Sequence, residues 1–366
     1  MSPTALHELL AEARRLPEGP ARVALCEAAV READASGDLD AGYNARLELI
    51  SAAEYSGADE RALVAFSWCL AQFDRHPDRF HPHGLLWRYK WILDNASDFP
   101  QLSLAQIERM EDDMEARVTR LGWSPRPVHY LRWANRMRIG NPDGRLMEFF
   151  EKWEAAPRDA LADCPACERN KHIELLVRLG ENERSLEVAA PILAGFLSCA
   201  EVPDGTYARL LTALVRLGQT ERARELQRRG HRAVSRKPAL LYEAASHVIF
   251  LVETGDLARA ARLLEKNLPW AVATANVNDR FSLYLAATRL TQALADRPRK
   301  TRKLDLPREL PCYQADGTYR PAELANWFRG ESVAMARQFD ERNGTAYNAL
   351  KLDHGGLFPV LPAAHA

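Results

Sequence analysis

Three cysteines are the residues of this chain whose type and spacing could do chemistry. Cys164 and Cys167 form a C-x-x-C pair in the segment DCPACE, and Cys199 follows in SCAEVP. Thiolates are preferred ligands of Zn²⁺, and three of them with one further ligand complete a tetrahedral site. A helix N-terminus also lowers the pKa of a thiol, which favours metal binding or redox chemistry. We therefore take these cysteines as a candidate Zn²⁺ or thiol site.

Two antiparallel helices must bring the three sulfur atoms together. The sequence predicts a first helix over about residues 165–179, which would rise roughly 22 Å. A second helix, over about residues 182–197, would descend by a similar length. Cys199 would then return to the level at which the first helix began, so the three sulfur atoms are expected to converge at one end of this hairpin.

The sequence does not identify the fourth ligand of such a site. His172 lies five residues after Cys167, which is more than one turn further along the helix and on a different face. The other neighbours are carboxylates, which are less usual partners: Asp163, Glu168 and Glu201. Two further interpretations stay open, namely a reversible disulfide and a structural role as small buried hydrophobic residues.

A recurring turn indicates how the helices are arranged. A hydrophobic helix end is followed by Gly and polar residues, then by a small residue in a new apolar stripe, in RLGENERSLEVA, RLGQTERARELQ and ETGDLARAARLL. The turn glycines Gly180, Gly218 and Gly255 are spaced 38 and 37 residues apart. Looser copies are RIGNPDGRLMEFF and YSGADERALVAF. This internal period is typical of a repeat architecture.

The residue types in this turn have a physical reason. Glycine ends a helix readily because it adopts positive φ without a Cβ clash. The small residue five positions later lets the two helices of a hairpin approach closely; these residues are Ser185, Ala223 and Ala260. A hairpin cannot bury its apolar face alone, so neighbouring hairpins must stack.

The repeated turn resembles the tetratricopeptide repeat family over about residues 40–295. The matching elements are the turn Gly, the Ala five residues later and a large residue four positions after that, such as Leu264. The period is near 38 instead of the 34 of that family, whose Trp and terminal Pro are mostly missing, so the array is an irregular member with longer helices. The chain is also similar to a bacterial group of tetratricopeptide-type proteins with a C-x-x-C…C element. The segments that carry this similarity are DCPACE…GENERSLEVAAPIL…SCAEVP…TYARLL and the later FDERNG. That similarity implies the fold and a cytoplasmic location, and it brings no established activity.

These observations predict an all-α chain, a right-handed superhelical solenoid of antiparallel, tetratricopeptide-like helical hairpins. We expect the repeat array at residues 1–295, a Pro-containing linker at 296–320, and a C-terminal capping helix with its tail at 321–366. Pro321 is suited to the first helical position and Gly344 to a C-terminal cap. A terminal cap is needed to shield the last apolar face of the array.

Composition narrows the possible partners and location. The 366 residues carry a formal charge of −1, which gives no electrostatic footprint for nucleic acid. The basic run at residues 297–303 is interpreted as a solvated linker. No apolar run approaches the roughly 18 residues of a membrane span, and the N-terminus lacks signal-peptide features. With only 6 cysteines, a disulfide scaffold is not expected, and the sequence predicts a cytoplasmic protein.

Functional residues other than the cysteines are expected on a binding surface. No nucleotide-binding, nucleophile-elbow or zinc-protease motif occurs, so no catalytic residue is predicted and the chain is not expected to be an enzyme. The expected concave groove would be lined by Asn44, Tyr130, Asn170, Glu174 and Tyr242. Of these, only Asn170 matches the Lys/Asn clamp with which some tetratricopeptide modules bind a chaperone's terminal carboxylate. His247 is interpreted as a core histidine with satisfied ring nitrogens.

Two functions from different classes follow. The first is a protein–protein or protein–peptide interaction scaffold that binds its partner in the groove. The alternative is a zinc- or thiol-dependent sensor that uses Cys164, Cys167 and Cys199. A helical enzyme of unidentified chemistry ranks last because no nucleophile, base or phosphate cradle can be named.

Overall fold

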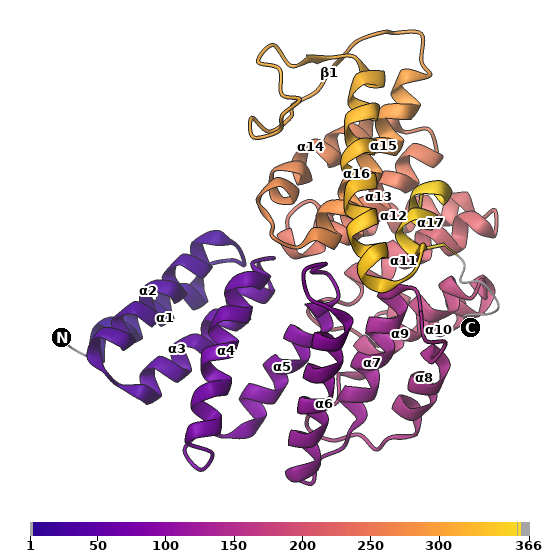
Figure 1. Cartoon of the computed structure of the whole chain (residues 1–366). Helices are drawn as coiled ribbons and strands as arrows, with labels where there is room; N and C mark the ends of the chain where they lie inside the picture. The colour runs from indigo at the N-terminus through magenta and orange to yellow at the C-terminus, as the bar shows by residue number, and fades with distance from the viewer. Residues whose placement is uncertain (1–2, 357, 360–366) are drawn as a thin grey trace. The chain divides into compact units, whose positions relative to one another are not determined.

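The computed structural model describes residues 3–356, 358 and 359 of the chain. Across these residues the chain is built almost entirely of helices, with 17 α-helices, one short 3-10 helix and two very short strands (Figure 1). The all-α part of the predicted fold class is thereby confirmed. None of the described helices combines the length and the apolar character that a membrane span requires.

The chain divides into two compact units. The N-terminal unit comprises Met1–Asn135, Glu148–Ala162 and Lys237–Ala239. The C-terminal unit comprises Arg136–Met147, Asp163–Arg236 and Leu240–Ala366. All three cysteines of the candidate site belong to the C-terminal unit.

Helices of the N-terminal unit pack against their neighbours in chain order. They are α1 (Pro3–Arg15), α2 (Pro20–Ser36), α3 (Leu39–Glu54), α4 (Asp59–Arg75), α5 (Pro82–Ala96), α6 (Leu104–Arg120), the first part of α7 (Arg126–Ile139) and most of α8 (Leu146–Ala155). Each of α1 to α5 contacts the next helix, and α3 also contacts α5. α6 begins with a capping box, in which the Ser103 hydroxyl accepts from the Gln106 backbone and the Gln106 side chain accepts from the Ser103 backbone.

The C-terminal unit contains the remaining elements. They are α9 (Pro165–Arg178), α10 (Asn182–Leu193), α11 (Asp204–Arg216), α12 (Thr220–Val234), η1 (Pro238–Leu240, at the unit boundary), α13 (Leu241–Glu253), α14 (Leu257–Ala273), α15 (Val277–Ala295), β1 (Arg302–Lys303), β2 (Thr318–Tyr319), α16 (Pro321–Asn343) and α17 (Tyr347–His354). Consecutive helices pack in pairs, α9 with α10, α11 with α12 and α13 with α14. Alternate helices also contact one another, α9 with α11, α11 with α13 and α13 with α15.

The predicted glycine turns are confirmed. Gly180, Gly218 and Gly255 have φ angles of 78°, 69° and 81°, and each follows the C-cap residue of its helix, α9, α11 or α13. After α9, the N–H of Gly180 bonds to the carbonyl of Val177 and the N–H of Glu181 to that of Leu176. This pair of bonds is the Schellman arrangement, which satisfies the last carbonyls of the helix. The same two bonds recur after α11 and α13, so one local signal closes three hairpins.

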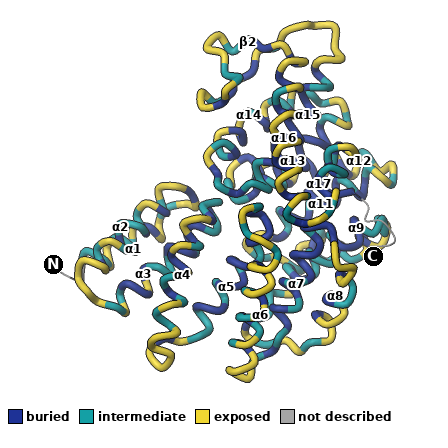
Figure 2. The backbone as a smooth tube through the Cα atoms, in the orientation of Figure 1, coloured by how far each residue is buried: buried dark blue, intermediate teal, exposed yellow. Residues whose placement is uncertain are grey.

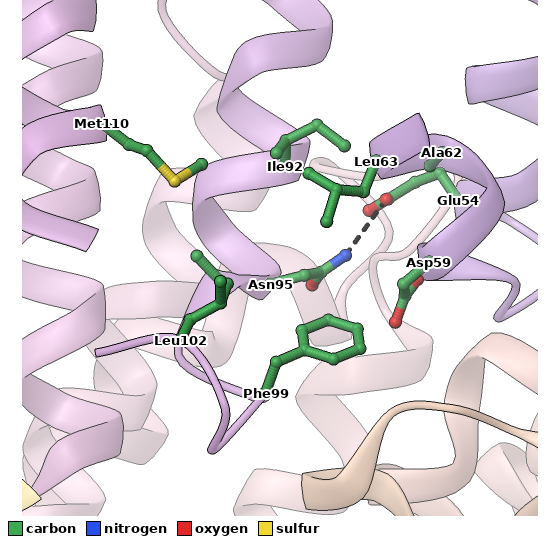
Figure 3. A pocket seen from close by; sticks show the side chains of 10 residues that line it. Glu54, Asp59, Ala62, Leu63, Ile92, Asn95, Phe99, Leu102 and Met110 are labelled. Atoms are coloured by element: carbon green, nitrogen blue, oxygen red, sulfur yellow. Dashed lines mark hydrogen bonds between the residues drawn. The ribbon is translucent and has the colours of Figure 1, made fainter. Parts of the chain in front are cut away.

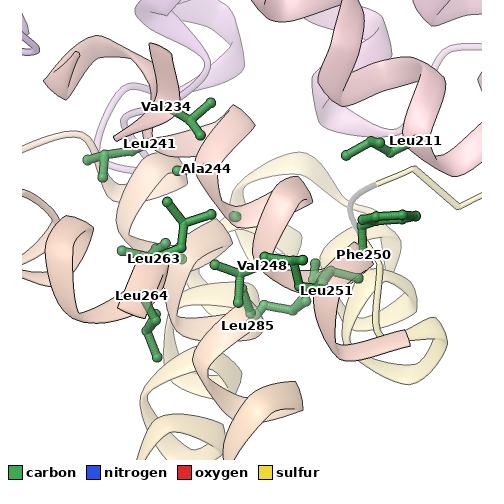
Figure 4. Close-up of a cluster of buried hydrophobic side chains, with 14 of the residues drawn as sticks. Leu211, Val234, Leu241, Ala244, Val248, Phe250, Leu251, Leu263, Leu264 and Leu285 are labelled. Atoms are coloured by element: carbon green, nitrogen blue, oxygen red, sulfur yellow. The ribbon is translucent and has the colours of Figure 1, made fainter. Parts of the chain in front are cut away.

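Small residues at the second helix of each hairpin are fully buried, as expected. Ser185, Ala223 and Ala260 each have a relative exposure of 0%. Ala223 and Ala260 belong to a continuous apolar cluster drawn from α9 to α16. Figure 4 shows part of this core, where Val248 and Leu251 of α13 lie close to Leu285 of α15. α13 and α15 are buried along most of their length (Figure 2).

The C-terminal segment contains the predicted helix and an unpredicted hairpin. α16 begins at Pro321 and ends before Gly344, whose φ is 64°, as the sequence indicates. It packs along α15, and the ring centroids of Phe328 and Tyr284 lie 5.2 Å apart. Within residues 296–320, expected only as a linker, β1 and β2 pair antiparallel. Strands of two residues carry too little alternation to be predicted from sequence.

Candidate metal centre

Cys164 forms the N-cap of α9. Its backbone is extended, Pro165 occupies the first helical position, and the Cys164 sulfur accepts a hydrogen bond from the backbone N–H of Cys167 at 3.4 Å. A proline suits this position because its fixed φ matches the helix and its missing N–H needs no partner. The C-x-x-C spacing therefore places one cysteine at the cap and the other in the first turn.

Cys199 reaches the start of α9 through the loop between α10 and α11. The second helix of the hairpin ends at Leu193, four residues earlier than expected, and Gly195 follows with a φ of 81°. The N–H of Cys199 donates to the carbonyl of Val202 at 3.0 Å, which closes a turn before α11. The return of Cys199 to the level of the α9 N-terminus thus depends on a loop as well as a helix.

The predicted convergence of the three sulfur atoms is observed. The Sγ atoms of Cys164, Cys167 and Cys199 all lie within 4.8 Å of one another, and those of Cys167 and Cys199 are 3.1 Å apart. Sulfur ligands at about 2.3 Å from a tetrahedral Zn²⁺ stand about 3.8 Å from each other. Zn²⁺ would require the closest pair to separate by about 0.7 Å. All three cysteines are free thiols and partly buried against the apolar core.

The pKa of the Cys167 thiol is shifted in the direction opposite to the one expected from the sequence. Burial raises the pKa of this thiol well above its usual range, and the neighbouring sulfur atoms of Cys199 and Cys164 raise it further. The helix N-terminus was expected to lower the pKa, but desolvation and the adjacent sulfurs have the larger effect here. A second thiolate in this cluster is therefore costly unless a cation compensates its charge. A Zn²⁺ ion held by these cysteines would supply that charge and favour the deprotonated form of its thiol ligands.

The part of the chain that the structure describes provides three ligands at this cluster. None of the residues considered as a fourth ligand joins it: His172, Asp163, Glu168 and Glu201. Zinc sites with three protein ligands complete their tetrahedron with water or another exchangeable ligand. The arrangement therefore fits Zn²⁺ with one open coordination position.

Two of the predicted groove residues, Glu174 and Tyr242, meet in one polar network. Glu174 of α9 accepts from Arg178 at 3.1 Å and from Arg209 of α11 at 2.9 Å. Arg209 also contacts Glu243 of α13 at 3.4 Å, and the Tyr242 hydroxyl lies 3.4 Å from Arg178. Burial alone would raise the pKa of Glu174, but the charges of Arg209 and Arg178 outweigh it and hold that pKa below its usual range.

The same network includes the C-terminal end of the described chain. Arg178 donates to the Tyr347 hydroxyl of α17, and the guanidinium lies 5.3 Å from the ring of Phe358. Phe358 also meets the ring of Tyr242 at 5.7 Å, and its carbonyl accepts from Arg216. Sequence reasoning missed Arg178 and Arg209, although Arg178 lies four residues after the predicted Glu174 on the same face of α9.

The other groove candidates have different surroundings. Asn170 is buried and accepts a hydrogen bond from the Thr206 hydroxyl at 2.8 Å. In the N-terminal unit, Asn44 is exposed, whereas Tyr130 is buried with its hydroxyl donating to Asp94 at 3.1 Å.

His247 is in the core, but its ring nitrogens are not satisfied as expected. The side chain is fully buried, and neither ring nitrogen has a hydrogen-bond partner among the described residues. Burial, with a smaller contribution from His231, lowers the pKa of His247 to about 3. The imidazole is therefore neutral at physiological pH.

A cavity in the N-terminal unit is a weaker candidate for a functional site. It has room for roughly one water molecule, with a volume of about 20 Å³. Figure 3 shows Leu63, Ile92, Phe99 and Leu102 around it, with the amide of Asn95 donating to Glu54 at 3.1 Å. Such a space is a packing defect and not a ligand pocket, because ligand pockets have volumes of several hundred Å³.

Comparison with known proteins adds no assignment. No protein-family model matches the chain, and no curated protein matches it. The resemblance to the tetratricopeptide family remains a prediction that rests on the repeated turn.

Proposed function

We propose that this chain is a zinc-binding helical-repeat protein whose metal centre is formed by Cys164, Cys167 and Cys199. The observation that carries the proposal is the convergence of three free thiols within 4.8 Å of one another, from two segments separated by a helical hairpin. Three thiolates match the ligand preference of Zn²⁺ better than that of Mg²⁺ or Ca²⁺, which bind oxygen.

Each cysteine has a distinct part in the proposed site. Cys164 caps α9, where its sulfur accepts a hydrogen bond from the backbone N–H of Cys167. Cys167 is the most shielded by its sulfur neighbours, and Cys199 brings the ligand from the α10–α11 loop. Binding releases the thiol protons to solvent, so affinity falls as pH is lowered.

The proposed metal connects the start of one hairpin to the start of the next. With Zn²⁺ bound, the N-terminus of α9 and the loop before α11 are held together, and metal-binding free energy adds to folding free energy. Without it, the Cys167–Cys199 contact is a weak thiol pair. Local order at this end of the hairpin then follows the supply of zinc, which is the basis of a sensor.

Metal analysis of the purified protein tests the proposal. Protein isolated from zinc-supplemented cells is expected to contain one Zn²⁺ per chain, and Cys167→Ser to contain far less. Cys312→Ser is the matched control, because Cys312 is a partly buried free cysteine of the same unit outside the cluster. Equal zinc in wild type and Cys167→Ser would overturn the proposal.

A second candidate function is a scaffold that binds a protein or peptide. We infer that the paired and alternating helix contacts of α9 to α15 form a tetratricopeptide-like solenoid, and that its groove is the face bearing Glu174, Arg209 and Glu243. Side chains from three alternate helices converge there, and Tyr347 and Phe358 of the same chain lie against them. The contact of the chain's own C-terminal segment supports a groove that accepts an aromatic ring beside a guanidinium.

Competition with the C-terminal segment tests this second function. Phe358→Ala weakens the internal contact with Arg178 and Tyr242, so a synthetic peptide of residues 345–359 is expected to bind the variant more tightly than wild type. Val333→Ala, a truncation at an exposed hydrophobic residue of α16, is the control. The absence of peptide binding to either variant would count against a peptide-binding groove.

A further inference from the structure

A basic groove lies between α12 and α14 of the C-terminal unit, away from the cysteines in sequence. Its volume is about 380 Å³, within the range of small-molecule sites. Five cationic side chains line it: Arg232, Arg236, Arg259, Arg262 and Lys266. Among the described residues, no Asp or Glu lines this groove.

The cations come from two walls. On α14, Arg259, Arg262 and Lys266 are spaced three and four residues apart, which places them on one face of the helix. The opposite wall is the C-terminal end of α12 with Arg232 and the following Arg236. Cations at a helix C-terminus are favourable on their own, but those in the middle of α14 gain nothing from the helix dipole.

One of the guanidinium groups is held in place. Arg259 donates to the side chain of Gln227 at 2.9 Å and lies 3.6 Å from the carboxylate of Asp256. Gln227 is itself buried, so it provides a fixed acceptor for this guanidinium. Arg262 and Lys266 are exposed and can move toward a ligand.

The electrostatic effect of these cations is visible at His231, which also lines the groove. Burial lowers the pKa of His231, and the charges of Arg259, Lys266 and Arg262 lower it further. Several positive charges therefore act on one small volume. Like charges held together cost folding free energy, and a bound anion removes that cost.

We propose that this groove binds a small organic molecule carrying two phosphate groups. A phosphate monoester carries about −1.5 to −2 charges and three acceptor oxygens, so two such groups balance most of five cations. Carboxylates carry one charge and two oxygens each, and more of them would have to fit in the same volume. Arginine, which supplies four of the five cations, binds phosphate in a bidentate manner.

Titration calorimetry with fructose 1,6-bisphosphate as the probe tests the proposal. At about 0.15 M salt, where exposed charges are largely screened, wild type is expected to show saturable binding at one site. Tricarballylate, a tricarboxylate, is expected to bind at least 10-fold more weakly. Arg262→Glu with Lys266→Glu is expected to lower the affinity at least 10-fold, and Arg232→Gln with Arg236→Gln to lower it through the other wall.

Two controls make the result decisive. Arg222→Glu with Arg228→Glu changes the same charge on exposed positions of α12 outside the groove, and it is expected to retain binding. Cys167→Ser is also expected to retain it, which separates this site from the proposed zinc centre. The proposal is overturned by absent binding in wild type, by equal affinity for tricarballylate, by equal loss in the Arg222/Arg228 variant or by loss in Cys167→Ser.

Discussion

The sulfur atoms of Cys167 and Cys199 lie 3.1 Å apart although 32 positions separate the residues in sequence. The chain between these two residues forms one helical hairpin, α9 and α10. The contact exists because this hairpin returns the chain to the level at which α9 begins. The distance is too long for a disulfide, which requires about 2.05 Å, and shorter than the sulfur separation in a zinc tetrahedron. A change of less than about 1.1 Å in this distance would bring the pair to either a disulfide or a zinc-bound geometry.

Zinc should raise the thermal stability of the protein through this pair. We expect the melting temperature of wild type to rise by several degrees with equimolar Zn²⁺, since metal binding to the folded state adds to its stability. Cys199→Ser should lose most of this rise. Cys312→Ser should keep it, and a rise of equal size in Cys199→Ser would show that zinc acts elsewhere.

Oxidation of the metal-free protein should join the same two residues. Hydrogen peroxide converts one thiolate to a sulfenic acid, and attack by the second forms the disulfide with release of water. Peptide mapping by mass spectrometry should find Cys167 linked to Cys199, and prior loading with Zn²⁺ should suppress the product. Preferential linkage of Cys164 to Cys199 would contradict the geometry.

The sequence predicted this site because a C-x-x-C at a helix start and a glycine turn are local signals. Gly180 fixes where α9 ends, and the helical rise then sets where Cys199 returns. The raised pKa of Cys167 was not predictable, because it depends on burial and on a sulfur neighbour from another segment. The early end of α10 at Leu193 was missed although Gly195 closes it with the same pair of backbone bonds, a local signal that the sequence carries.

Breaking the buried ion pair of Glu174 should strongly destabilise the C-terminal unit. Glu174→Gln leaves Arg209 and Arg178 without their shared carboxylate, at a cost of about 3–5 kcal/mol in the free energy of unfolding. Chemical denaturation at pH 7 measures this loss. Glu187→Gln, at an exposed position of α10, is the control and should change stability by less than about 0.5 kcal/mol.

The same carboxylate should give wild type an acid-sensitive stability. Because the pKa of Glu174 is lower in the folded state than its unfolded value near 4.5, its contribution is full above that value and is lost as the pH falls below it. Glu174→Gln should therefore show a flatter decline of stability below about pH 4.5. An unchanged acid profile would mean that the pair does not carry this dependence.

His247 should add a second acid-sensitive contribution at higher pH. Its folded pKa of about 3 lies below the usual 6.5, so the unfolded chain binds the proton first. Stability should fall by about 1.4 kcal/mol for each pH unit below about 6.5. His247→Leu should reduce this slope between pH 6.5 and 5, whereas His354→Leu, at an exposed position of α17, should leave it unchanged.

Close packing against His247 should make one helical glycine intolerant of a methyl group. A Cβ at Gly230 of α12 would lie 2.7 Å from Cε1 of His247, so Gly230→Ala should cost about 1–3 kcal/mol. Gly330 of α16 faces open space, and Gly330→Ala should instead stabilise by about 0.5–1 kcal/mol. Stabilisation by both substitutions would show that the core around His247 relaxes freely.

Long-range polar contacts were the part of the fold that sequence reasoning could not reach. Glu174 and Tyr242 were recognised from their positions on the first helix of a repeat hairpin. The contacts of Arg209 with Glu174 and of Arg178 with Tyr242 are specified by the stacking of alternate helices. The basic groove likewise depends on which faces of α12 and α14 meet. Local signals predict where helices begin and end, and stacking decides which side chains meet.

X-ray absorption at the zinc edge tests the central claim most directly. The proposed centre predicts a coordination shell of three sulfur atoms at about 2.3 Å and one lighter atom from the open position. Cys167→Ser should lose a sulfur from this shell or bind no zinc, and Cys312→Ser should match wild type. A wild-type shell of only oxygen and nitrogen, or a three-sulfur shell that survives in Cys167→Ser, would contradict the account.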